Sequence, residues 1–188
     1  MTVSFLSGLL RRARSGDEEA FVKVVEATRE RLFWAVRRMV GREALAEEIL
    51  QDAYMALWDM PGKASPDNPE AWLRRVCVNR ALDHLRREET RSHQLGSEAL
   101  DQLPAPATLE DTMGVRELEA ALHRALSTLP AQENAAFVLK VVEGLGYPEV
   151  ASNLGVAEST ARNQVMQARR KLGKALAALG IEPCRSRT

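Results

Sequence analysis

Residues 146–172 read GYPEVASNLGVAESTARNQVMQARRKL, a stretch that predicts two helices joined by a tight turn. Pro148 suits the first turn of the first helix, where its missing N–H is no loss, and Gly155 permits the left-handed backbone that ends that helix. Ser159 or Thr160 can then cap the second helix. One apolar stripe runs along the second helix, at Ala161, Val165, Ala168 and Leu172. This pattern predicts a helix-turn-helix.

The other face of the second helix is polar and partly basic, and it comprises Ser159, Arg162, Asn163, Met166, Gln167 and Arg170. In a helix-turn-helix the second helix lies in the DNA major groove, where its outward side chains contact base edges and phosphates. The stretch therefore indicates a DNA-binding protein.

The composition is compatible with DNA binding only when the positions of the charged residues along the chain are considered. The chain has 188 residues, 45% of them hydrophobic, and a formal net charge of zero, which by itself argues against a nucleic-acid binder. The charges lie in blocks, however. Residues 43–59 are acidic and contain no Lys or Arg, whereas residues 162–174 are basic. Such alternation indicates DNA-facing surfaces beside acidic surfaces for protein partners.

Helical periodicity also dominates the first half of the chain. It predicts a helix from about Asp17 to Gly41 that could be broken at residues 27–30, a second with its apolar face from Ala46 to Leu57, and a third from Pro69 or Glu70 to about Glu89. Residues 60–69 are rich in proline and form a loop.

The predicted fold is all-α, with two small helical domains joined by a flexible linker, the C-terminal one carrying the helix-turn-helix. Residues 90–112 show no periodicity and contain two prolines, which is typical of a linker. From Gly114 a second helical unit runs to about Leu179, with breaks at Pro130 and near residues 144–146. The expected division is 1–91, a linker at 92–113, 114–180, and a tail at 181–188.

The third helix has a face with its own DNA-binding chemistry. Trp72, Arg75, Asn79, Asp83 and Arg86 fall in one row. An indole stacks on an unpaired base, arginines bind phosphates and an amide can hydrogen-bond a base edge, so the row fits single-stranded DNA. The alternative is a core tryptophan beside solvated arginines, and the row alone does not decide between the two.

No other chemistry is indicated. Cys77 lies in an apolar stripe and is expected to be a buried thiol, while Cys184 has no His or Cys near it. The three histidines are isolated along the sequence, so we expect no metal site and no cofactor. We find no signal peptide and no apolar run long enough to span a membrane, and we expect a cytoplasmic protein without membrane insertion.

Taken in order, these segments resemble an extracytoplasmic-function sigma factor of bacterial RNA polymerase. Residues 46–54, AEEILQDAY, resemble the family's acidic helix that docks on the polymerase clamp. Residues 72–87, WLRRVCVNRALDHLRR, are similar to the helix that melts and holds the minus-ten element. Residues 126–130, LSTLP, and the helix-turn-helix resemble the domain that reads the minus-thirty-five element. The chain departs from residues common in the family at Leu45, Ala161 and Gln167.

The resemblance implies a role for each surface. Contact with core polymerase falls to Glu47, Glu48, Gln51 and Asp52. Contact with the minus-ten element falls to Trp72, Arg75, Asn79, Arg80, Arg86 and Arg87. On the minus-thirty-five element, Arg162, Asn163, Met166 and Gln167 would face base edges, and Thr160, Arg169, Arg170 and Lys171 would touch phosphates.

The resemblance also implies the partners. They are core RNA polymerase, promoter DNA in duplex and melted form, and an anti-sigma factor, with no small-molecule substrate. A sigma factor is not an enzyme, because the polymerase supplies the catalytic magnesium. A linker of about 20 residues could reach about 65 Å when extended, which is nearly two turns of DNA.

Two other classes of protein stay open on the residues alone. A conventional helix-turn-helix regulator would act without being a polymerase subunit, but it leaves the 46–54 and 72–87 helices without a role. An all-helical adaptor would use both basic faces only as solvated surface.

Overall fold

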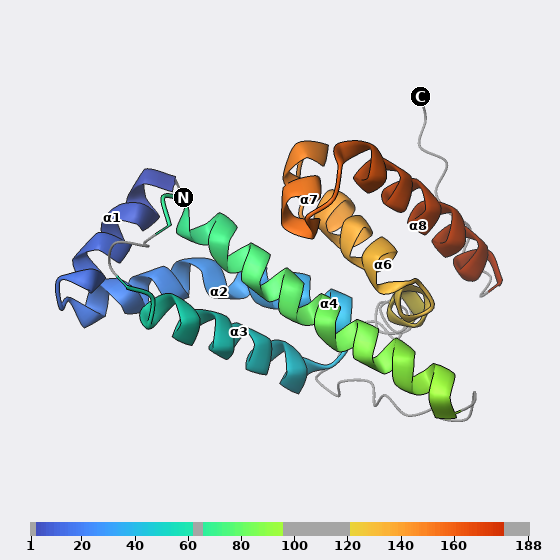
Figure 1. Ribbon diagram of the computed structural model, residues 1–188, viewed down its shortest axis with the longest axis horizontal. Coiled ribbons are helices and arrows are strands. Elements are labelled where there is room, and N and C mark those ends of the chain that lie inside the picture. Colours follow the sequence, from blue (N-terminus) through green and yellow to red (C-terminus); the bar gives the residue numbers. More distant parts are fainter. Residues whose placement is uncertain (1–2, 62–65, 96–120, 179–188) are drawn as a thin grey trace, which may run out of the picture.

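The computed structural model describes residues 3–61, 66–95 and 121–178. All regular secondary structure in these ranges is helical, which confirms the all-α prediction. The helices form an N-terminal group and a C-terminal group that lie against each other (Figure 1). The expected linker beyond residue 95 and the expected tail lie outside the described residues.

The N-terminal group contains α1 (Val3–Arg14), α2 (Glu18–Val40), α3 (Glu43–Trp58) and α4 (Pro69–Leu95). Helix α2 starts where the sequence predicts: Asp17 Oδ1 accepts the Ala20 N–H at 3.0 Å. This bond, together with Arg12, lowers the pKa of Asp17. Helix α2 ends at Gly41, whose φ of +73° is a left-handed cap.

The C-terminal group contains residues 121–127, α6 (Ala131–Phe137), the π-helical turn η2 (Val138–Val142), α7 (Tyr147–Leu154) and α8 (Glu158–Ala178). As predicted, Pro148 lies in the first turn of α7, and Gly155 ends that helix with φ +65°. The predicted cap of the last helix is wrong. Helix α8 starts at Glu158, so Ser159 and Thr160 lie within its first turn, and the Ala157 carbonyl accepts from Ala161 N–H at 3.0 Å.

Three features of the N-terminal group differ from the prediction. Helix α1 was not expected, although its buried residues Leu6, Leu9, Leu10 and Ala13 have helical spacing. Helix α2 continues without a break through residues 27–30. Helix α4 runs to Leu95, beyond both the expected helix end at Glu89 and the expected linker start at residue 92. Residues 89–94 are all polar and give no apolar period, so this extension was not visible in the pattern.

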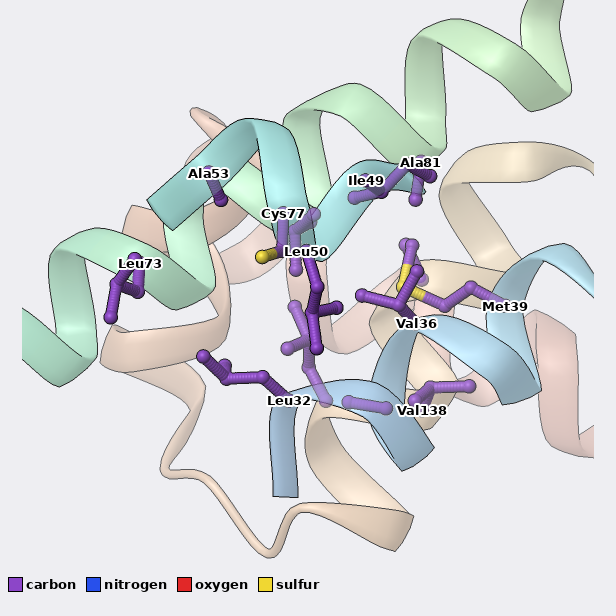
Figure 2. Close-up of a cluster of buried hydrophobic side chains, with 14 of the residues drawn as sticks. Leu32, Val36, Met39, Ile49, Leu50, Ala53, Leu73, Cys77, Ala81 and Val138 are labelled. Carbon is purple, nitrogen blue, oxygen red and sulfur yellow. The ribbon is translucent and has the colours of Figure 1, made fainter. Parts of the chain in front are cut away.

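One buried cluster includes residues from both groups (Figure 2). Leu32 and Val36 of α2 and Leu50 of α3 meet Cys77 of α4, and Val138 of η2 lies beside the α2 residues. Cys77 is buried, which confirms the expected core cysteine, and this burial raises the pKa of its thiol to about 12. The C-terminal group thus completes the core of the N-terminal one.

Polar contacts reinforce the joint between the groups. Glu89 Oε1 on α4 accepts the Ala131 N–H at the start of α6 at 2.7 Å. The buried Asn134 side-chain amide donates to the Met39 carbonyl at 3.2 Å. Because backbone groups at helix ends lack partners within their own helix, these bonds satisfy polar groups that the joint would otherwise bury unpaired.

Candidate nucleic-acid interface

Helix α8 buries the predicted stripe and exposes the opposite face. Ala161 and Ala168 are completely buried, and Val165 and Leu172 are almost so. The stripe packs on α6, on α7 and on a small cluster that includes Leu126 and Leu129. The predicted contact residues lie on the other side, where Thr160, Arg162, Asn163, Met166, Arg169 and Arg170 are exposed and Gln167 is half-buried. Met166 on this face is 58% exposed.

Arg162 is held by two neighbours. Its Nε and Nη2 donate to Glu158 Oε1 at 3.1 and 2.5 Å, one helical turn earlier. Its guanidinium carbon lies 4.2 Å from the centre of the Tyr147 ring at the start of α7. The Lys140 ammonium lies 4.8 Å from the same ring, so two cations share one aromatic side chain.

The basic residues at the far end of this face are not equivalent. Lys171 is half-buried, and its Nζ donates to Glu133 Oε1 on α6 at 2.8 Å. Arg169 and Arg170 are exposed and have no anionic partner within the described ranges. Among the basic residues predicted to touch phosphates, Arg169 and Arg170 are therefore the ones whose charge is not paired within the described ranges.

Helix α4 displays the predicted row, with differences between its members. Arg75, Asn79 and Arg86 are exposed, and Asn79 has no hydrogen-bond partner in the part of the chain described. Trp72 is half-buried and packs against the main core, so its indole is shared between core and surface. Arg87 is exposed, whereas Arg80 is half-buried.

Helix α3 presents the predicted acidic face. Glu48, Gln51 and Asp52 are exposed, and Met55 beside them is 53% exposed. Glu47 Oε1 accepts from Arg29 Nη2 of α2 at 2.6 Å, so part of its charge is used within the chain. Glu48 has no cationic partner in the described ranges, which leaves it the freest carboxylate of the predicted set.

A polar groove of about 130 Å³ runs between α3 and α4 and joins two of the predicted surfaces. Its lining includes Glu48 and Asp52 on α3 and Arg80 and Arg87 on α4. Arg80 donates to Asp52 across the groove. The predicted polymerase-binding and minus-ten residues thus contact each other directly, which the sequence did not predict.

Several residues that shape these surfaces were missed from the sequence. Tyr147, Glu158 and Glu133 hold basic residues of α8. Arg74, in a basic block of the sequence, is buried in the structure and pairs with Glu70 at 3.0 Å. An i, i+4 spacing could have indicated the Glu158–Arg162 pair. The same spacing joins Glu70 and Arg74, whereas no local pattern indicates the contacts of Tyr147 and Glu133.

Within the described ranges, no helix is long and apolar enough to cross a membrane. Among the same residues, no group of His, Cys, Asp and Glu side chains is placed to hold a metal ion. Two of the departures noted above are packing positions, because Leu45 and Ala161 are both buried.

Comparison with known proteins identifies two family segments. Residues 24–91 match the family model described as Sigma-70 region 2, and residues 119–172 match Sigma-70, region 4. These ranges contain the α3 and α4 surfaces and the helix-turn-helix, respectively.

A curated relative covers nearly the whole chain. The ECF RNA polymerase sigma factor SigE of Mycolicibacterium smegmatis is 30% identical over 176 residues, which are 92% of this chain and 68% of that protein.

Two solved structures share the fold. CnrH in complex with the cytosolic domain of CnrY aligns with a TM-score of 0.66 at 24% identity, over 92% of this chain and 97% of that one. The sigma factor RpoE in complex with the anti-sigma factor NepR, from Bartonella quintana, aligns with a TM-score of 0.62 at 19% identity, over 84% and 96%.

Proposed function

The chain belongs to the extracytoplasmic-function sigma factors of RNA polymerase, and from this membership we propose how its surfaces divide the work of transcription initiation. Sigma factors are initiation factors and not catalysts by themselves. This one directs core polymerase to promoters, and the proposals below concern the residues with which it does so.

Helix α8 reads the minus-thirty-five element in duplex DNA. The observation that carries this proposal is its exposed face, on which Arg162, Asn163 and Met166 project from a helix anchored by four buried residues. Gln167 lies at the edge of this face. Arg169 and Arg170 supply phosphate contacts, with Thr160 at the near end. Lys171 contributes less because Glu133 already neutralises it.

Helix α4 holds the minus-ten element once the strands separate. Asn79 is exposed and has no hydrogen-bond partner among the described residues, so its amide is free for a base edge. Arg75, Arg86 and Arg87 offer exposed charge for phosphates, and the half-buried Trp72 indole offers an aromatic surface on which an unpaired base can stack. Arg80 reaches DNA only if its pair with Asp52 opens.

Helix α3 docks on core polymerase. Glu48, Gln51 and Asp52 form an exposed acidic and amide surface, with Glu47 at its margin and Met55 as an apolar contact. A surface of this sign suits a basic partner, and charge complementarity steers such encounters. We propose that the N-terminal domain extends to the end of α4 at Leu95 and that the C-terminal domain spans residues 114–180.

We further propose that an anti-sigma factor binds this chain. The support is the shared fold with RpoE, which was solved in complex with the anti-sigma factor NepR. The protein acts in the cytoplasm, because its polymerase and promoters are there.

Reconstituted transcription tests the proposal. Core polymerase with this chain should start transcripts from selected promoters that core polymerase alone does not use. A conventional regulator would shift duplex DNA without polymerase and would not confer initiation on core. Absence of promoter-specific initiation with pure core polymerase would contradict the proposed division of roles.

A further inference from the structure

Tyr147 lies where it can control the residue proposed to read the minus-thirty-five element. It is the first residue of α7, and Arg162 lies on α8, across the turn of the helix-turn-helix. The guanidinium carbon of Arg162 is 4.2 Å from the ring centre, well inside the roughly 6 Å range of cation–π attraction. The two helices are thus joined at their exposed edge by this stack, in addition to their apolar contacts.

The ion pair with Glu158 fixes the guanidinium in a second direction. Glu158 Oε1 accepts from Nε and Nη2, which form one side of the guanidinium plane. The outer side, formed by Nη1 and the second hydrogen of Nη2, has no partner in the described ranges. A guanidinium has five N–H donors, and two parallel donors are what the O6 and N7 acceptors of guanine require.

The ring itself is anchored from both directions along the chain. Gly146 N–H donates to Glu149 Oε2 at 2.8 Å, which fixes the backbone at the start of α7. Lys140 of η2 donates to the Leu145 carbonyl at 2.9 Å while its ammonium lies 4.8 Å from the Tyr147 ring centre. The Tyr147 hydroxyl makes no hydrogen bond with the described residues, and the ring makes both cation contacts.

We propose that Tyr147 is a positioning residue that determines specificity: its ring holds the Arg162 guanidinium in place, with the outer edge free for a guanine base. The gain is entropic, because an arginine already held in one orientation loses less rotamer freedom on binding. Tyr147 acts through Arg162 and need not touch DNA. This inference rests on the proposed role of Arg162 in reading a base.

The test uses holoenzyme assembled from core polymerase and the full chain, with a promoter library randomised in the minus-thirty-five element. Arg162→Ala should relax the preference at one base pair. Tyr147→Leu should relax the same base pair by about two- to fivefold, the factor that an exposed cation–π contact provides. Tyr147→Phe keeps the ring and should select as the wild type does. Tyr147→Leu combined with Arg162→Ala should match Arg162→Ala alone.

The outcomes separate this inference from the proposed function beneath it. If Arg162→Ala leaves the selected sequence unchanged, base reading by Arg162 is wrong and the inference fails with it. If Arg162→Ala relaxes one position but Tyr147→Leu does not, only the positioning role fails. A uniform loss of binding in Tyr147→Leu, or Tyr147→Phe behaving like Tyr147→Leu, would show a purely structural role and overturn the inference.

Discussion

Arg80 on α4 donates to the Asp52 carboxylate on α3, so a residue proposed to bind DNA is paired with one proposed to bind polymerase. Both side chains are partly exposed, and such a pair contributes about 0–1 kcal/mol to stability. Its main consequence is for function. Removing either charge leaves the other unpaired at the neighbouring surface, so a substitution at Asp52 changes the DNA side as well as the polymerase side.

Charge reversal at Glu48 is therefore the cleaner test of polymerase docking. Glu48→Lys should weaken association with core polymerase by up to about fivefold at low salt, since one exposed ion pair contributes about 0.2–1 kcal/mol. The loss should shrink as salt screens the interface. Binding at two ionic strengths measures it. Glu26→Lys, on an exposed position of α2, is the matched control, and equal affinity in both variants would remove Glu48 from the docking surface.

The helix-turn-helix was predictable because its information is local. The stripe from Ala161 to Leu172 has the helical period, and Gly155 can adopt the left-handed backbone of the turn without strain. The second helix and the turn were therefore both predicted from the sequence. Helix α1 carries the same kind of signal at Leu6 and Leu10 but was not predicted. What a stripe cannot show is which element covers it.

Contacts between distant segments could not be predicted, because a local pattern does not show which other segment packs against it. Arg31 on α2 donates to Glu143 after η2 at 2.8 Å, although 112 residues separate them. Arg and Glu residues recur along the chain, and nothing in their spacing selects one partner. The same holds for Tyr147 and Arg162, whose approach depends on the angle between α7 and α8. The sequence therefore indicates the surfaces, and the structure supplies their internal pairing.

Strand separation should depend on Asn79 more than initial binding does. Asn79→Ala removes an exposed amide that has no partner within the described part of the chain, so folding should be unchanged while open-complex formation falls. Permanganate reactivity of unpaired thymines reports melting, and duplex binding is measured in parallel. Thr90→Ala, at another exposed position of α4, should melt promoters normally. Trp72→Ala should also impair melting but will lose core packing, so its unfolding free energy must be measured alongside. Normal promoter melting by the Asn79→Ala variant would show that Asn79 does not contact the separated strand.

The joint between the two helix groups should be sensitive to a single methyl group. Gly41 has φ +73°, and a Cβ there would lie 1.7 Å from His123 Nε2. Gly41→Ala should therefore lower the free energy of unfolding by more than the ~1–2 kcal/mol of left-handed backbone strain alone. Gly8→Ala, which has open space in α1, should instead stabilise by about 0.5–1 kcal/mol. If Gly41→Ala in a His123→Ala background costs as much as it does alone, the imidazole is not the obstacle.

The same joint should weaken in acid. Burial, and then the nearby Arg37, lower the pKa of His123 below its ordinary 6.5. The unfolded chain then binds a proton at higher pH than the folded chain, so this group's contribution is present above about pH 6.5 and is lost as the pH falls toward the folded pKa. Urea unfolding at pH 7.5 and at successively lower pH should show the decline, and His123→Gln should reduce it. An identical pH dependence in His123→Gln would assign the effect to other groups.

Base reading and phosphate anchoring should separate on α8. Arg162 lies near the start of the helix with the outer edge of its guanidinium unpaired, whereas Arg170 lies about two turns further on, exposed and without a partner in the described ranges. Arg162→Ala should cost about 1–3 kcal/mol at particular base pairs and relax the preference there. Arg170→Ala should weaken all sequences alike and reduce the salt dependence by about one unit of slope. Selection from a randomised minus-thirty-five library with each mutant holoenzyme, at two salt concentrations, distinguishes the two. If Arg170→Ala changes the selected sequence while Arg162→Ala changes only affinity, the helix enters the groove in a different register from the one proposed.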